Sequence, residues 1–390
     1  MKILNIITRL NIGGASIHVV EISQLFNNET YSSTVLYGNV ESNEKDMLYL
    51  AREYDFPMIN LPSMGRSVNP LIDLYLIWQV YRVIRSLKPD IVHTHTAKAG
   101  FAGRLAARLA GVPVILHTFH GNNFRGYFGK LMSTVSILIE RLLARLSTCI
   151  IAISEQQRQE LLDFRITTAE KLRVIHLGFD FSRILHTETH KNLFKKAYGI
   201  RPDQHLVAFV GRLTAIKDPF ELIKIATRIF TSAQASDSAP TRDDIVFTFV
   251  GDGELAEELK AEVRRLGYQE NIIFTGFIKD LKPLYADAEV LLLTSLNEGT
   301  PVSIIEAMAN RVAVVASRVG GIPNLITDQE SGLLISPQDT AAFSSSILDI
   351  IDHPEKYQTM RETAYSKITT DYSIERLKTE LEILFRDLGF

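Results

Sequence analysis

The sequence predicts an α/β protein of two domains, each built on a parallel β-sheet with crossover helices. The first observation is the length of 390 residues, which exceeds one ordinary core and suits two domains of about 150–200 residues. The second is that strand-length apolar runs alternate with longer segments of helical period. The third is a polar interruption of this alternation near mid-chain. Together they favour two Rossmann-like halves joined by a hinge.

In the first half, the alternation predicts seven strands. Helical patterns separate them at Leu71–Leu87, Ala99–Ala110 and Phe128–Leu146. Strands that alternate with helices usually form parallel sheets, so we expect one such sheet here. The predicted strands are Ile3–Ile7, Thr34–Tyr37, Met58–Leu61, Ile91–His93, Val114–His117, Cys149–Ile153 and Leu172–His176.

The second half repeats the pattern after the stretch Phe179–Asn192, which turns polar and predicts the hinge. We place the first domain at residues 1–182 and the second at residues 183–370. The segment Thr231–Asp244 is small and polar and predicts a mobile surface loop. The predicted strands are Leu206–Val210, Ile245–Val250, Ile272–Phe274, Val290–Leu293 and Val312–Ala316.

The last segment predicts an amphipathic helix over Ile374–Leu388. This helix is long enough to cross the seam between the two domains. We therefore expect residues 371–390 to pack back on the first domain.

Composition excludes several classes of protein. One cysteine, Cys149, rules out an internal disulfide framework and fits a reducing compartment. The first residues lack a small-residue cleavage site, so we interpret them as a strand rather than an export signal. The longest apolar stretch, Leu131–Ile153, is interrupted by charged residues and is not expected to span a membrane. We expect a cytoplasmic protein without a nucleic-acid partner.

The net charge of −3 conceals a basic region in the first half. Residues 61–150 hold eleven basic side chains and three acidic ones. The segments Leu71–Leu87 and Leu131–Leu146 combine apolar faces with cations, which suits helices that lie on an anionic bilayer. Solvated surfaces and core packing explain the same residues equally well. A peripheral location on the cytoplasmic face of the inner membrane therefore stays open beside a freely dissolved one.

The most specific phrase in the chain is EGTPVSIIEAMA at residues 298–309. It follows the predicted strand Val290–Leu293, and Pro301 suits the first turn of a helix. Glu298 would then lie in the loop and Glu306 in the helix, with free N–H groups at the helix start available to a phosphate. Taken singly, the two acids would be ordinary surface residues. The complete phrase favours a binding site.

This phrase resembles the two-glutamate motif of the retaining family-4 glycosyltransferases, which have the GT-B fold. Other pieces stand in that family's order: GGA at 13–15 before His18, DIVHTH at 90–95, LHTFHG at 116–121, GRLTAIKD at 211–218 and VGDGE at 250–254. The likeness spans nearly the whole chain. It implies two Rossmann-like domains whose sheets face across a cleft, with the acceptor on the first and the donor on the second.

The resemblance implies transfer of a hexose-type sugar, with retention of configuration, from a nucleotide diphosphate donor to an acceptor. The commonest donor in the family is a UDP-sugar. The implied acceptor is a glycan or a lipid-linked molecule of envelope or surface polysaccharide synthesis.

Arg212 and Lys217 have a physical role of their own beside the resemblance. They follow the predicted strand Leu206–Val210, at a carboxyl end where open α/β sheets bind ligands. A nucleoside diphosphate gains negative charge as it leaves, so two fixed cations would stabilise the transition state more than the ground state. The alternative is that Arg212 and Lys217 are ordinary solvated surface cations. We expect no metal and no other cofactor, because these cations supply the countercharge.

The resemblance also assigns contacts to the donor. Glu298 would bind hydroxyls of the sugar and Glu306 those of the ribose, while the backbone near Phe277 and Ile278 would face the nucleobase. The pair Gly13–Gly14 would bring backbone amides close to phosphate, although a tight turn explains it too. The expected donor-binding residues are Gly13, Gly14, Arg212, Lys217, Gly251, Phe277, Ile278, Glu298, Gly299, Thr300, Pro301, Val302, Ser303 and Glu306.

His120, which precedes Gly121, resembles the family's active-site histidine near the donor sugar. We expect it to form the catalytic set with Arg212, Lys217 and Glu298. A histidine with a purely structural role is the alternative. The acceptor-side candidates are His18, His95, Asn122 and Arg125. Asn122 stands where relatives often have a second histidine, which leaves the acceptor open.

The histidines at predicted strand ends invite a zinc site, because His93 and His95, and His117 and His120, are closely spaced. No cysteine lies nearby and no third-ligand pattern follows, so we expect no metal there.

Three rival functions remain at this stage. The first is another enzyme of the same fold. It is either a nucleotide-sugar epimerase, which product analysis identifies because it needs no acceptor, or a glycan phosphorylase, which the chain's size disfavours. A non-catalytic sugar-nucleotide-binding protein would bind the donor without turnover. A dehydrogenase is a more distant alternative, because Gly251-Asp-Gly253 lacks the third glycine of the dinucleotide fingerprint.

Overall fold

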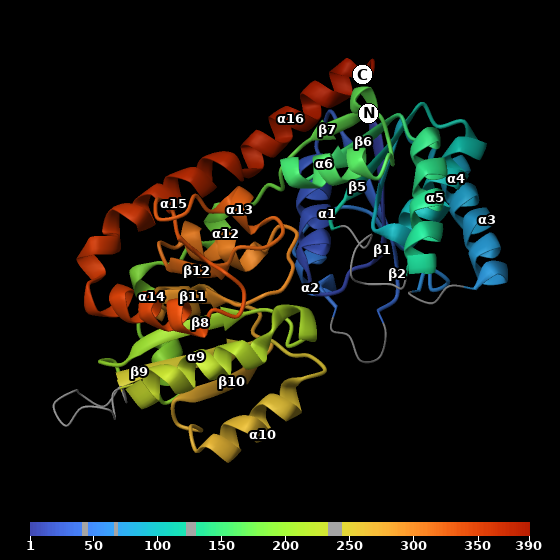
Figure 1. Ribbon diagram of the computed structural model, residues 1–390. Helices are drawn as coiled ribbons and strands as arrows, with labels where there is room; N and C mark the ends of the chain where they lie inside the picture. The colour runs from blue at the N-terminus through green and yellow to red at the C-terminus, as the bar shows by residue number, and fades with distance from the viewer. Residues whose placement is uncertain (41–45, 66–68, 122–129, 233–243) are drawn as a thin grey trace. The chain divides into compact units, whose positions relative to one another are not determined.

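The computed structural model describes residues 1–40, 46–65, 69–121, 130–232 and 244–390 (Figure 1). The chain forms two compact units, which we call unit 1 and unit 2. Unit 1 comprises Met1–Phe179 and Tyr372–Phe390, and unit 2 comprises Asp180–Asp371. The sequence analysis placed the boundaries at residues 182 and 370. The acceptor-side candidates Asn122 and Arg125, and all but the ends of the predicted loop Thr231–Asp244, lie outside the described residues.

Unit 1 contains a seven-stranded parallel sheet in the order β3-β2-β1-β4-β5-β6-β7. All seven predicted strands are present, with shifts of a few residues at their ends. Except in the short edge strands β3 and β7, their interiors are buried, which fits a sheet covered on both faces, and polar side chains such as Asn5, His93 and His117 lie among the apolar ones. The strands are β1 Lys2–Arg9, β2 Ser32–Gly38, β3 Met58–Asn60, β4 Ile91–His95, β5 Val114–Phe119, β6 Cys149–Ala152 and β7 Leu172–Val174.

The helices of unit 1 begin and end where the local sequence favours it. In α3, the Asn69 side chain accepts hydrogen bonds from two backbone amides and Pro70 occupies the first turn. In α4, Gly111 ends the helix in the left-handed conformation. The helices are α1 Gly14–Leu25, α2 Leu48–Ala51, α3 Pro70–Leu87, α4 Ala97–Ala110, α5 Lys130–Leu146, α6 Glu155–Asp163 and α16 Ile374–Asp387.

Helix α16 completes the core of unit 1, although it follows unit 2 in the chain. Its residues Leu377, Leu381 and Phe385 are buried in one cluster with Ile3 of β1 and Ile91 of β4. The backbone of Phe179 also bonds to both Tyr372 and Ile374, which fixes the start of the helix.

Unit 2 contains a six-stranded parallel sheet in the order β10-β9-β8-β11-β12-β13. The five predicted strands are present. The sequence analysis missed β13, a three-residue edge strand that is too short for a periodic signal. The strands are β8 His205–Val210, β9 Ile245–Val250, β10 Ile272–Gly276, β11 Val290–Leu293, β12 Ala313–Ser317 and β13 Leu333–Ile335.

The helices of unit 2 cover this sheet and form its main core with the strands. Helix α14 packs on α9, and α15 packs on α12. The α-helices are α7 Phe181–Ile184, α8 Leu193–Ala197, α9 Pro219–Ser232, α10 Ala256–Leu266, α11 Lys282–Asp287, α12 Val302–Ala309, α13 Ile322–Leu325, α14 Thr340–Asp352 and α15 Gln358–Asp371. Among the described residues, no helix has the length and apolarity needed to cross a membrane.

Each sheet has a point at which the strand order reverses. In unit 1 the chain extends from β1 to β2 and β3 on one side and continues at β4 on the other. In unit 2 the same reversal separates β8 from β11. Open α/β sheets bind ligands beyond the carboxyl ends of strands at such points. The candidate site residues of both units are therefore expected near these two strand pairs.

Candidate functional site

The charged centre of unit 2 lies beyond the carboxyl ends of β8 and β11. Lys217 ends a short 3-10 turn after β8, and its Nζ forms an ion pair with Glu298 Oε1 in the loop after β11. Ser295 Oγ donates a hydrogen bond of 2.6 Å to the same oxygen. The Lys217 and Glu298 side chains are only 21% and 8% exposed. Two of the predicted catalytic residues therefore meet in a partly buried site.

The two loops that carry this pair are also joined through their backbones. Thr294 Oγ1 donates hydrogen bonds to the carbonyl oxygens of Lys217 and Asp218, at 3.1 and 2.9 Å. The Leu296 amide donates to the Ile216 carbonyl at 2.9 Å. Because both loops are fixed, little reorganisation of Lys217 and Glu298 is needed when a ligand arrives.

The Glu298 loop rests on a second glycine pair that the sequence analysis did not identify. The Gly321 amide donates to the Glu298 carbonyl at 2.9 Å. A Cβ on Gly321 would lie 1.9 Å from the Gly299 carbonyl oxygen, and one on Gly320 would lie 2.1 Å from that of Glu298. Only glycines permit this approach. A Gly-Gly pair that follows β12 was the signal available in the sequence.

Glu306 lies in α12, apart from the Lys217–Glu298 pair. Its Oε2 accepts a hydrogen bond of 2.8 Å from the hydroxyl of Tyr285 in α11. Burial raises the pKa of Glu306 to about 7, an effect that the Tyr285 hydrogen bond partly opposes. The sequence analysis missed Tyr285, because no spacing links residues 21 positions apart in different helices.

The rest of the phrase after Glu298 forms the start of α12. Gly299 and Thr300 belong to the loop, Pro301 caps the helix, and Val302 and Ser303 form its first turn. No side chain caps these amides. The helix start therefore presents its backbone N–H groups where the motif predicts a phosphate.

Arg212 follows β8 but does not join the Lys217–Glu298 pair. Its side chain is 61% exposed and lies 3.9 Å from Glu254. The neighbouring Gly251 comes so close to Gly211 that a Cβ would lie 2.0 Å from its carbonyl oxygen. Phe277 and Ile278 follow β10 and are partly buried. These residues lie beyond the carboxyl ends of the neighbouring strands β8, β9 and β10.

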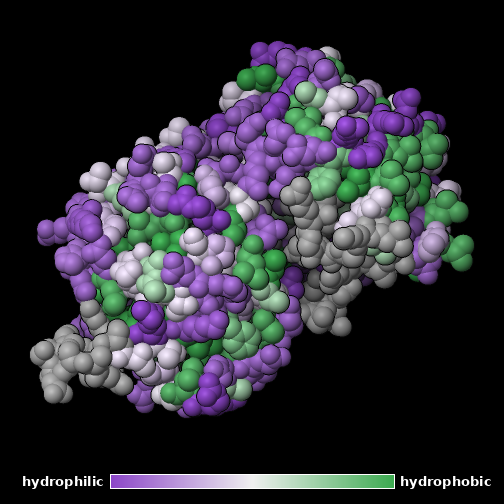
Figure 2. All heavy atoms as spheres, viewed as in Figure 1, coloured by the Kyte–Doolittle hydropathy of each residue, from purple (hydrophilic) through white to green (hydrophobic). Residues whose placement is uncertain are grey.

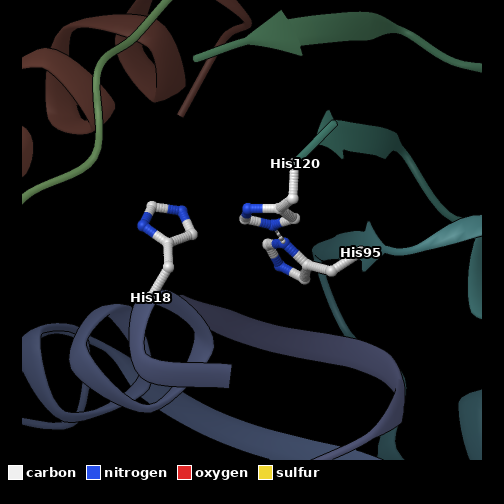
Figure 3. A group of neighbouring side chains, drawn as sticks. All are labelled: His18, His95 and His120. Carbon is white, nitrogen blue, oxygen red and sulfur yellow. Dashed lines mark hydrogen bonds between the residues drawn. The ribbon is translucent and has the colours of Figure 1, made fainter. Parts of the chain in front are cut away.

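The corresponding position in unit 1 holds a cluster of histidines instead of ions. His18 lies in α1, His95 ends β4, and His120 follows β5 (Figure 3). His95 Nδ1 and His120 Nε2 are hydrogen-bonded at 3.0 Å, and the His18 ring lies edge-on to both rings. The sequence analysis found no third residue to accompany the histidines of β4 and β5. The fold supplies one, because α1 brings His18 back to the end of β4.

Burial keeps these imidazoles neutral near pH 7. It lowers the pKa of His120 to about 4 and holds the pKa values of His18 and His95 well below the ordinary range, with neighbouring histidines adding to the effect. In contrast to the charged pair in unit 2, this cluster contributes hydrogen-bonding groups without a formal charge.

His93 and His117 were expected at strand ends, but they lie within β4 and β5. His93 Nε2 is hydrogen-bonded to Thr118 Oγ1 at 2.7 Å, and His117 Nδ1 to Thr94 Oγ1 at 2.8 Å. These bonds pair neighbouring strands through their side chains, so the two histidines have structural partners.

Gly13 and Gly14 stand between β1 and α1. Gly13 caps the helix, and its carbonyl oxygen accepts a hydrogen bond of 3.1 Å from the Ser16 amide. No side chain caps the first amides of α1. This glycine turn lies beyond the carboxyl end of β1, beside the strand that carries His95.

Both halves of the chain match models of glycosyltransferase families. The model of Glycosyltransferase Family 4 matches residues 12–183, and that of Glycosyl transferases group 1 matches residues 190–367. A UDP-Gal:alpha-D-GlcNAc-diphosphoundecaprenol alpha-1,3-galactosyltransferase of Escherichia coli is 27% identical over 84% of this chain and 83% of its own. An alpha-D-kanosaminyltransferase of Streptomyces kanamyceticus is 24% identical over 85% and 88% of the two chains.

Solved structures agree on the fold. The Anabaena protein HepE, crystallised with UDP and glucose, superposes with a TM-score of 0.83 at 20% identity and covers 99% of both chains. Two open parallel sheets in this arrangement of strands are the GT-B fold. The chain belongs to the family-4 glycosyltransferases.

Proposed function

We propose that this glycosyltransferase moves a hexose from a UDP-sugar to a lipid-linked or glycan acceptor with retention of configuration. The observation that carries the proposal is the Lys217–Glu298 pair beyond the ends of β8 and β11. An ammonium group beside a carboxylate suits a ligand that presents phosphate oxygens next to sugar hydroxyls. A UDP-sugar has both groups.

In the proposed reaction, the bond between the anomeric carbon and the diphosphate oxygen breaks. The acceptor oxygen forms a bond to that carbon on the same face, and its proton passes to the departing diphosphate. Lys217 and Arg212 neutralise the charge that the diphosphate gains, so no metal is needed for this step. Glu298 accepts hydrogen bonds from the sugar, and its orientation is fixed by Ser295. His120 is proposed to contact the donor sugar.

Glu306 is proposed to bind the ribose. Its carboxylate accepts from Tyr285 through one oxygen, which leaves lone pairs for the hydroxyls of a nucleoside. The backbone at Phe277 and Ile278 is proposed to face the base. Uracil is the base we propose, because the E. coli relative is named for a UDP-galactose donor.

A lipid-linked acceptor is proposed on two grounds. The same relative acts on a diphosphoundecaprenol. In unit 1, α3 and α5 carry an unusual number of exposed apolar side chains, visible over α5 in Figure 2. They are Leu71, Ile72, Leu74, Tyr75 and Trp78 of α3, and Met132, Val135, Leu138, Ile139 and Leu142 of α5.

The charges on these helices suit an anionic surface. Their acidic residues Asp73 and Glu140 are held in ion pairs with Lys98 and Arg104, both at helix α4. Arg82 and Arg85 of α3 remain exposed, with Arg82 stacked on Trp78 at 5.0 Å. We propose that this face rests on the cytoplasmic leaflet of the inner membrane.

A panel of nucleotide sugars tests the donor. UDP-hexoses should raise the melting temperature of the protein more than GDP- or ADP-hexoses, and should support transfer to a diphosphoprenol acceptor. Transfer in excess EDTA tests whether a metal is needed. Interconversion of the donor sugar with its epimer in the absence of an acceptor would instead establish an epimerase. Donor binding without turnover would establish a non-catalytic protein.

Intrinsic fluorescence tests membrane binding, because Trp78 is the single tryptophan of the chain. Its emission should shift to the blue with anionic liposomes at low salt and stay unchanged with neutral ones. Leu138→Glu should weaken sedimentation with these liposomes. Ile383→Glu is the matched control, since Ile383 is a similarly exposed apolar residue on α16. A protein that never sediments with anionic liposomes would contradict the membrane proposal.

A further inference from the structure

The histidine cluster of unit 1 has the composition of a transition-metal site. His18, His95 and His120 each place a ring nitrogen within 4.8 Å of the others (Figure 3). Imidazole is a preferred ligand of Zn²⁺, and three histidines with one open position form a known type of zinc centre. The three rings come from α1, β4 and the segment after β5, so the fold rather than a local motif brings them together.

The hydrogen bonding of the cluster leaves ring nitrogens unused. His18 Nδ1, His95 Nε2 and His120 Nδ1 are buried and have no hydrogen-bond partner among the described residues. The single bond between His95 and His120 uses the other nitrogen of each ring. Buried polar atoms without partners cost free energy, and native structures usually satisfy them with water or a ligand. Each of the three rings therefore keeps a buried nitrogen that no described residue satisfies and that a water or an ion can bind.

We propose that His18, His95 and His120 bind one transition-metal dication of the Zn²⁺ type. Tetrahedral Zn–N bonds of about 2.0–2.1 Å place ligand nitrogens about 3.3 Å apart. The ring nitrogens lie within 4.8 Å of one another, so they have to approach by at most about 1.5 Å. The three imidazoles are neutral, and Arg376 of α16, whose positive charge acts on His18, is itself paired with Glu380 at 2.6 Å. The three protein ligands leave a position for water or for an oxygen of a substrate.

Zinc binding would compete with sugar transfer. This consequence rests on the proposed function, which gives the His120 ring to the donor sugar. An ion bound to the His120 ring would make that ring unavailable to the donor sugar. Zn²⁺ should therefore inhibit transfer, and excess EDTA should restore it.

Titration calorimetry of the full chain with ZnCl₂, without donor or acceptor, tests the site. One equivalent should bind, and Co²⁺ should give the visible absorption of a four-coordinate centre. His18→Gln and His95→Gln should each weaken Zn²⁺ at least about tenfold. The control is His353→Gln, which removes an exposed histidine that lies 2.9 Å from Asp349 and should leave the affinity unchanged.

Melting curves of the variants separate lost ligands from lost folding. Should His18→Gln prove unfolded, zinc X-ray absorption of the wild-type protein still decides the matter, because the proposal requires about three nitrogen neighbours. Wild-type protein that binds no Zn²⁺, or that loses Zn²⁺ with His353→Gln alone, would overturn the site. Zinc that binds the three histidines without inhibiting transfer would uphold the site and contradict the role of His120 in the proposed function.

Discussion

The two units share an architecture, but the candidate site of unit 2 contains an ion pair and that of unit 1 contains neutral imidazoles. In both, the candidate residues lie beyond parallel strands at the reversal of strand order, β1 and β4 in unit 1 and β8 and β11 in unit 2. Unit 2 places a partnered ammonium and carboxylate there, whereas unit 1 places buried neutral imidazoles. The difference indicates that the sheet sets only the position of a site. The loops set its charge, and with it the chemistry it can support.

The largest expected effect follows from the charged pair. Lys217→Ala should lower kcat about 10³-fold, because it removes a cation from the departing diphosphate. Glu298→Ala should lower it to a similar degree, and the double variant should be little worse, since the two act as a unit. Steady-state kinetics with a saturating donor provide the measurement. Lys260→Ala, which breaks an exposed Lys–Glu pair on α10, is the matched control. Near-normal kcat in either single variant would refute that residue's role.

His120→Gln should have a smaller effect, about fivefold in kcat/KM. The ring contributes a neutral hydrogen bond, whose loss is worth about 1 kcal/mol. A loss in His120→Gln as large as that in Lys217→Ala would break the contrast between the units, because it would require a charge or proton-transfer role for His120. A pH–rate profile of both variants would then identify the group.

Glu306 should make donor binding depend on pH. A ribose contact needs the ionised carboxylate, and burial raises the pKa of Glu306 to about 7. Donor affinity should therefore reach its full value above about pH 8, be halved near pH 7 and fall about tenfold per pH unit below about pH 6. Glu306→Gln should bind weakly and show no such dependence. Equilibrium binding of UDP between pH 5.5 and 8.5 provides the test, and an unchanged slope in Glu306→Gln would assign the titration to another group.

Tyr285→Phe should move that profile rather than remove it. The Tyr285 hydroxyl stabilises the charged form of Glu306 and so opposes the effect of burial. Without it the pKa of Glu306 should rise further, and the midpoint of UDP binding should move upward in pH. The midpoint of the binding curve decides the matter: a midpoint that moves down or stays in place would show that the hydroxyl does not act on Glu306.

The smallest effect concerns the support of the Glu298 loop. Gly321→Ala should destabilise the protein by about 1–3 kcal/mol, because the new Cβ would overlap the Gly299 carbonyl. Gly65→Ala is the control, since no atom lies within 4 Å of its Cβ position. Thermal denaturation of both variants measures the difference. Equal melting temperatures would mean that the loop relaxes without cost.

The sequence predicted the sheets well because their signal is local. Apolar runs such as Ile245–Val250 and Val290–Leu293 are buried on both faces and stand out from the helices around them. The edge strand Leu333–Ile335 was not predicted, because three residues are too few to show a hydrophobic periodicity. Its place in the sheet comes from pairing with β12, which the sequence does not display.

The candidate site was predictable as a set of residues but not as a set of contacts. Lys217 and Glu298 were selected by motif, yet their ion pair and the Ser295 hydrogen bond depend on how two loops 81 positions apart meet. Tyr285 and His18 have no motif that links them to their partners. Such pairings arise from the order of strands in the sheet, which no spacing along the chain encodes.

The assignment of Tyr372–Phe390 to unit 1 has a consequence for how the protein is made. During synthesis, residues 180–371 can fold as one continuous segment as soon as they leave the ribosome. Unit 1 is synthesised first, but its core is completed last. Leu377, Leu381 and Phe385 reach this core only after all of unit 2 has been translated. Until then, the apolar residues of β1, β4 and β5 that pack against α16, such as Ile3, Ile91 and Leu116, lack these partners.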